Sequence, residues 1–161
     1  MGEQPFKSFR IYNSLAPIAT DSSGKDGIGY AVDGFDHAFF ICSVGAGAGD
    51  SDDTVAFQIS KDSDSLVDSD GSYTDITAAT ITSGAPSGDT DTFPLATYQI
   101  AIDLLKINLP TGMLRASATA SAGGASLASA VMILHGGSGV RPNWDTDMFV
   151  DSDIVYVTAD T

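Results

Sequence analysis

The 161-residue chain contains a single glutamate, Glu3, and a single cysteine, Cys42, so 20 of its 21 acidic residues are aspartates. Glutamate favours helices, whereas aspartate favours turns and caps. The composition therefore predicts many turns and few helices. One cysteine excludes an internal disulfide. Cys42 stands in an apolar run, so we expect a small buried side chain and not a nucleophile.

Positive charge is also scarce, because only 7 lysines and arginines oppose the 21 acids and leave a net charge of −14. A surface this negative repels phosphate, so we expect no nucleic-acid partner. No apolar run approaches the length of a membrane span, and the N-terminal sequence MGEQPFKSFR has no apolar signal-peptide core. We therefore expect no membrane partner and synthesis in a cytoplasm without Sec-type export.

The segment from Phe35 to Ser83 carries the clearest strand signals. Residues 37–44 form a dense apolar run that predicts a strand buried on both faces, and a Gly/Asp turn follows it. Residues 55–60 alternate apolar and polar side chains, which is typical of a strand with one buried face. An Asp-rich turn over 61–71 then leads into a short strand at 72–76.

The same reading along the rest of the chain predicts further strands at 28–32, 95–105, 113–120, 127–135 and 148–158. The segment 113–120 has a helical alternative because it is rich in alanine. Residues 1–27 form either an N-terminal arm or an edge strand, since Pro17 is compatible with a sheet edge. We predict one all-β domain over 1–161, a β-sandwich of about eight strands, jelly-roll-like or Ig-like.

The Asp-rich turn is the strongest candidate for a metal site, because hard oxygen ligands in a loop suit Ca²⁺. The candidate ligands in this turn are Asp62, Asp64, Asp68 and Asp70. The EF-hand pattern fails, since Leu66 stands where the first acidic ligand would be when Asp68 and Asp70 are aligned to it. A solvated acidic turn is the favoured interpretation, and we expect no cofactor, with Ca²⁺ as the alternative.

The sequence carries no catalytic motif: it has no nucleophile elbow, P-loop or H-E-x-x-H. His37 opens one predicted strand and His135 ends another. Two histidines this far apart, without ligand spacing, do not define a zinc site. We therefore predict that the protein is not an enzyme.

Several short motifs occur in a fixed order: V-x-F-Q-I-S-x-D at 55–62, S-Y-T-D-I at 72–76, I-D-L at 102–104 and L-R-A-S at 114–117. This order, over about residues 35–136, resembles the capsid-decoration proteins of tailed bacteriophages. The resemblance implies a structural virion protein that decorates or cements the outer capsid surface. Its partners would be the major capsid protein and further copies of itself, with a trimer favoured, and it would be made in the host cytoplasm.

Candidate interface residues are Phe6, Phe9, Arg10 and Trp144. An exposed Trp beside Arg141 would suit an interface anchor, although Trp144 covering one end of the sandwich is an equal alternative. For Phe6 and Phe9 the alternative is an ordinary core position in a first strand. The competing function is a carbohydrate-binding sandwich, assisted by Ca²⁺ and using Tyr73 and Trp144.

Overall fold

The computed structural model of the chain describes residues 9–45, 54–62, 72–83, 96–109, 112–121, 126–136 and 154–158. Within these ranges the only helical element is the short 3-10 turn η1 (Leu104–Lys106). The strands are β1 (Phe9–Thr20), β2 (Lys25–Asp26), β3 (Tyr30–Ala31), β4 (His37–Val44), β5 (Val55–Asp62), β6 (Tyr73–Thr82), β7 (Ala96–Asp103), β8 (Met113–Ala120), β9 (Ser126–His135) and β10 (Ile154–Val157).

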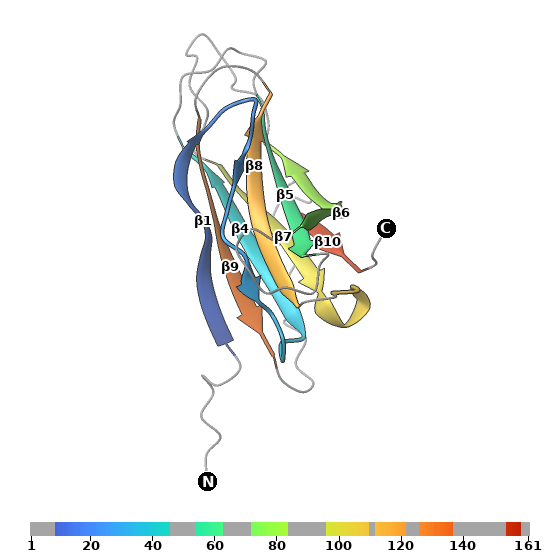
Figure 1. The fold of residues 1–161 in the computed structure, drawn as a ribbon. Helices are drawn as coiled ribbons and strands as arrows, with labels where there is room; N and C mark the ends of the chain where they lie inside the picture. The colour runs from blue at the N-terminus through green and yellow to red at the C-terminus, as the bar shows by residue number, and fades with distance from the viewer. Residues whose placement is uncertain are drawn as a thin grey trace.

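The strands form two sheets (Figure 1). The β1 sheet has the order β1-β9-β4-β7-β10, and the β8 sheet has the order β2-β8-β5-β6 with β3 also paired to β8. The strands from β1 to β9 pair in a nested order, from the outermost two in the sequence to the innermost two. β1 pairs with β9, β2 and β3 pair with β8, β4 pairs with β7, and β5 pairs with β6. An antiparallel ribbon wound in this way into two sheets is the jelly roll.

The predicted all-β sandwich is thus confirmed, and the strand order selects the jelly roll over the Ig-like alternative. The predicted strand at 37–44 has the same bounds as β4, and the alanine-rich segment 113–120 is a strand, not a helix. Several boundaries differ, and the short strand predicted at 72–76 extends to Thr82 as β6. Strand β5 continues through Asp62, which pairs with Tyr73, and β7 ends at Asp103, whose side chain accepts a hydrogen bond from the Leu105 amide and starts η1.

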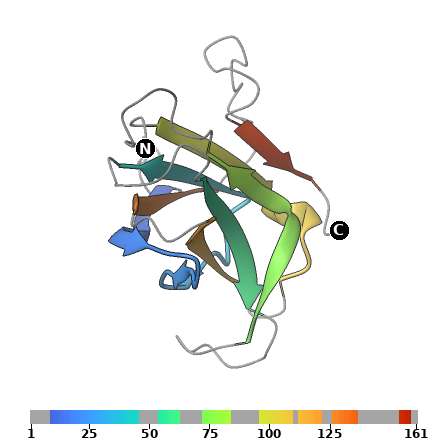
Figure 2. The ribbon, with the colours of Figure 1, turned by 90° about the horizontal axis from the view of Figure 1, so that it is seen from above.

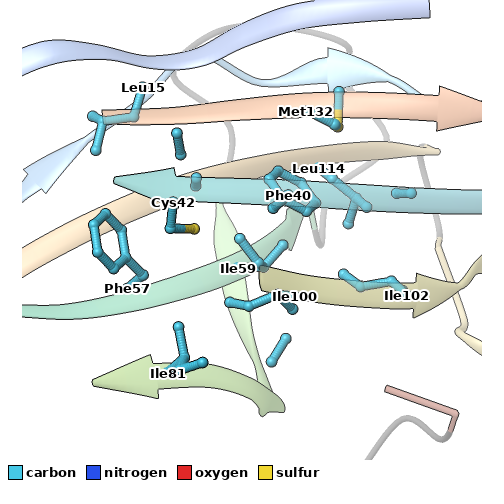
Figure 3. Close-up of a cluster of buried hydrophobic side chains, with 14 of the residues drawn as sticks. Leu15, Phe40, Cys42, Phe57, Ile59, Ile81, Ile100, Ile102, Leu114 and Met132 are labelled. Atoms are coloured by element: carbon cyan, nitrogen blue, oxygen red, sulfur yellow. The ribbon is translucent and has the colours of Figure 1, made fainter. Parts of the chain in front are cut away.

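The core lies between the sheets and follows from strict alternation along the strands. In β4 and β9, buried and half-buried residues alternate, and β5 does the same up to Ile59. Figure 3 shows the centre of the cluster, where side chains from both sheets meet. The largest fully buried ones are Phe40, Phe57, Ile59, Ile76, Ile100, Ile102, Leu114, Met132 and Leu134.

One side of the sandwich is closed by hydrogen bonds from β1 to the opposite sheet. The buried Ser14 hydroxyl accepts from the Ala116 amide at 2.9 Å, and the buried Thr20 hydroxyl donates to the Ala118 carbonyl at 3.0 Å. Ile28 donates its amide to the Ser14 carbonyl at 2.7 Å. These bonds satisfy polar groups that would otherwise be buried without partners.

The other side carries an added strand. β10 pairs in parallel with β7, with Ile154 opposite Gln99 and Val157 opposite Ile102. Figure 2, which looks down on the sandwich, shows β10 beside β7 at the edge of the sheet. Val157 is buried, so β10 extends the core past the jelly-roll strands.

Strand β6 departs from regular pairing at a wide bulge. Gln58 pairs with Thr80 and Ser60 with Asp75, so two steps along β5 match five along β6. The Gln58 side-chain amide donates to the carbonyls of Ile76 at 2.8 Å and Ala79 at 3.3 Å, and its Oε1 accepts from the Thr80 hydroxyl. One side chain therefore replaces the ladder bonds that the bulge removes.

We predict that Gln58→Ala lowers the free energy of unfolding by about 1–3 kcal/mol, because the two bulge carbonyls lose their donor. Urea denaturation measures this change. Thr119→Ala, at an exposed position of the neighbouring strand, is the control and should stay within about 0.5 kcal/mol of the parent. Equal stability of the two variants would contradict the assigned role of Gln58.

We also predict that Gly27→Ala destabilises the fold by about 2–3 kcal/mol. A Cβ at Gly27 would lie 2.0 Å from the Ser14 carbonyl oxygen and 2.6 Å from that of Ala116, both backbone atoms. Gly34→Ala is the comparison: its Cβ meets no atom within 4 Å, and only its positive φ of 82° carries a cost of about 1 kcal/mol. Thermal unfolding of both variants should rank them in this order, and a reversed order would be evidence against the close approach.

Candidate functional site

The outer faces of the two sheets differ sharply in chemistry. The outer face of the β8 sheet is polar, as expected of a surface in water. The described side chains of its outward positions are Gln58, Ser60, Asp62, Tyr73, Asp75, Thr80, Thr82, Arg115, Ser117 and Thr119, together with Ala56. Ser60 and Asp62 are covered by their neighbours and buried. Ser60 donates to Asp75 at 2.7 Å, which ties neighbouring strands together on this face.

The middle of the outer face of the β1 sheet is apolar, between a polar row of Ser129, Ser43 and Thr97 and a row of His135, His37 and Asp103. The pairing register places one row across all five strands: Ile11, Ile133, Phe39, Ala101 and Tyr156. The next row runs through Asn13, Val131, Ile41, Gln99 and Ile154. We call the outward residues Ile11, Phe39, Ile41, Val131, Ile133 and Tyr156 the apolar face.

Exposure is greatest at the margins of this face. Ile11 on β1 is 59 % exposed and Tyr156 on β10 is 46 % exposed, while the four central members are half-buried. Leu127, at the far end of β9, adds another exposed apolar side chain. The two rows contain no charged residue, although the chain carries a net charge of −14. A contiguous apolar surface without charge is typical of an interaction site.

One end of the apolar face carries both histidines of the chain. His37 on β4 is directly opposite His135 on β9, and Asp103 on β7 is opposite His37 on the other side. The sequence analysis treated the two histidines as distant, and pairing of β4 with β9 brings them together. Asp103 is already engaged, since it accepts from the Leu105 amide at 3.2 Å and lies 3.5 Å from the Lys106 ammonium.

The predicted interface residues are only partly described. Arg10 lies exposed in β1, opposite Leu134, and Phe9 begins the same strand opposite His135. Phe6 and Trp144 lie outside the described residues, and their interface role stays a prediction. Strand β1 contributes Ile11 to the apolar face, whereas Arg10 is opposite the buried Leu134 and so alternates to the other side of the strand.

The acidic candidates for Ca²⁺ are similarly divided. Asp62 is the last residue of β5 and is fully buried, whereas the prediction placed it in an exposed turn. Asp64, Asp68 and Asp70 lie outside the described residues. Within the described ranges, no group of three or more His, Cys, Asp or Glu side chains is arranged to hold a metal ion.

Tyr73, a candidate for sugar stacking, lies on the polar face. The Arg115 guanidinium stands 4.1 Å from the centre of the Tyr73 ring and forms an ion pair with Asp26 at 3.1 Å. The guanidinium cation is attracted to the electron-rich face of the ring and covers that face. Only the opposite face of Tyr73 could stack on a sugar ring.

Cys42 is fully buried in the core, as predicted. Burial raises the pKa of its thiol to about 12, because the apolar surroundings penalise the thiolate. The thiolate is the reactive form, so this cysteine is inert in the folded protein. No described helix is long and apolar enough to cross a membrane.

We predict that Cys42 does not react with a disulfide reagent such as DTNB at pH 8 in the native protein. Unfolding in guanidinium should release one thiol per chain, since burial and the raised pKa are both lost. Absorbance of the released thiolate measures the reaction. Fast stoichiometric labelling before unfolding would show that β4 opens readily.

Neither the apolar face nor the histidine pair could be predicted from the sequence. Each strand that contributes to the face showed only its own alternation, and the face exists because five strands align in register. The sequence does contain a weak signal. In β4 and β9 the inward and the outward residues are both rich in apolar side chains, whereas a strand with one buried face needs apolar side chains only on the inward side.

No protein-family model matches the sequence, and no curated protein does. Two solved structures of infectious bursal disease virus, the VP2 subviral particle and the Gx strain, are similar to this chain, each with a TM-score of 0.45. Their sequence identities are 13 % and 15 %, over 86 % and 88 % of this chain and 38 % of theirs. The chain thus spans well under half of those chains. A TM-score below 0.5 marks only partial overlap of two folds, so no family or function follows from it.

Proposed function

We propose that the chain is a structural virion protein that binds the outer surface of a phage capsid and decorates or cements it. The observation that carries this proposal is the contrast between the two outer faces. One sheet presents polar side chains to water, and the other presents the apolar face. A protein whose role is to adhere to a protein shell needs this asymmetry.

The apolar face supplies the docking energy. Ile11 and Tyr156 retain large exposed fractions that a partner surface would bury. Burial of apolar area stabilises a complex by about 25 cal/mol per Å² before the costs of association. The uncharged rows add no desolvation penalty for buried ions, which would offset that gain.

The partner in this proposal is the major capsid protein, which presents the same site many times over a shell. Modest affinity at one site is then multiplied when several copies are linked. We therefore include self-association, with a closed trimer favoured, in the proposal. Arg10 and Phe9 lie at the start of β1, and we include them in the proposed contact together with Phe6 and Trp144.

A catalytic role has no support among the described residues. The one thiol is buried, and the Ser60 hydroxyl is engaged by Asp75 and not by a histidine. Nucleophilic catalysis needs a base within hydrogen-bond reach of the nucleophile. The proposed role is accordingly structural.

Co-sedimentation with purified capsid shells that lack this chain tests the proposal. We expect saturable binding with a fixed ratio of chain to capsid protein. Ile11→Asp should weaken binding at least tenfold, about 1.4 kcal/mol, because it places a charge in the apolar face. Ile11 is exposed, so the variant should still fold.

Thr119→Asp is the matched control, because it adds the same charge at an exposed position of the polar face. Its binding should remain within twofold of the parent. Absence of binding by the parent would overturn the proposed function. Equal loss in both variants would overturn the assignment of the apolar face and point to a general effect of added negative charge.

A further inference from the structure

The two histidines form a cross-strand pair. His37 in β4 and His135 in β9 occupy directly opposite positions of an antiparallel ladder, and both alternate outward with the apolar face. Cβ atoms at such positions lie about 4.5–5.5 Å apart. Two imidazole nitrogens can therefore converge on one ion at the Zn–N distance of about 2.0–2.1 Å.

Among the residues that the structure describes, no side chain or backbone group forms a hydrogen bond or ion pair with the imidazole of His37 or His135. The Nδ1 atom of His135 is buried and has no hydrogen-bond partner. Buried polar nitrogens normally have a partner, so this ring calls for an explanation.

The backbone holds the pair firmly. His37 is paired on both sides, with His135 on β9 and with Asp103 on β7. The carbonyl of His135 accepts from the Asp36 amide at 3.1 Å, and the carbonyl of Asp36 accepts from the Leu104 amide at 2.9 Å. Ligands on such a rigid frame lose little freedom when they bind an ion.

We propose that His37 and His135 together bind a transition-metal ion of the class that prefers imidazole, namely Zn²⁺, Ni²⁺ or Cu²⁺. Hard ions such as Ca²⁺ and Mg²⁺ prefer oxygen ligands and do not suit this pair. Among the described residues no third ligand joins the pair. The site is separate from the acidic turn that the sequence analysis considered for Ca²⁺, and it does not depend on the proposed capsid role.

Isothermal titration of the untagged chain with ZnCl₂ tests the site, because the chain has only two histidines and no other imidazole can compete. We expect one strong site per chain. His37→Gln and His135→Gln should each weaken Zn²⁺ binding tenfold or more, and Ca²⁺ should not displace the bound Zn²⁺.

Asp75→Asn is the matched control, since it removes a carboxylate from the polar face and leaves both imidazoles in place. It should bind Zn²⁺ as the parent does. Zn²⁺ binding that survives either histidine substitution unchanged, or that falls equally in Asp75→Asn, would assign binding to carboxylates and overturn the proposal. Absence of binding by the parent would overturn it as well.

A second measurement does not rely on variants that must fold. The electron paramagnetic resonance spectrum of the parent chain with one equivalent of Cu²⁺ should show hyperfine coupling from two nitrogens. A spectrum with oxygen ligands alone, or with a single nitrogen, would overturn the two-imidazole site.

Discussion

The placement of β4 between β9 and β7 is the constraint on which the rest of the structure depends. All eight residues of β4 have a partner on each side. Ala38, Phe40, Cys42 and Val44 thereby enter the core, while the alternate residues point outward. A slip by one residue would exchange the two sets and bring Phe39 and Ile41 inside. One register therefore fixes the core, the apolar face and the histidine pair together.

The sheet edges favour assembly through a face and not through strand addition. β1 carries Pro17 and two register irregularities, and β6 carries the bulge that Gln58 fills. β10 has four residues, and β2 and β3 have two each. Prolines, bulges and short strands all hinder the pairing of an edge with another chain. The apolar face is thus the described surface best suited to a partner.

Local pattern was sufficient to predict most strands, since alternation is a property of each segment alone. The bounds of β4 and the strand nature of 113–120 follow from such patterns. Pairing is not local, so nothing near His37 indicates a partner 98 positions away at His135. Asp62 looked like part of an acidic turn, and its burial depends on pairing with Tyr73 across a connection outside the described residues. The candidate interface at Phe6 and Trp144 rests on sequence alone.

The described aspartates lie both in turns and on strands, but none lies in the two rows of the apolar face. Several described aspartates occupy turns, where Asp21 accepts hydrogen bonds from Ser23 and the side chain of Lys25, and these bonds lower its pKa. The two rows of the apolar face instead hold mostly branched and aromatic residues. Charge placed in turns discourages non-specific association in solution, whereas an uncharged sheet face can be desolvated at small cost. The same chain can therefore remain dispersed at high charge and still adhere to a surface that matches one face.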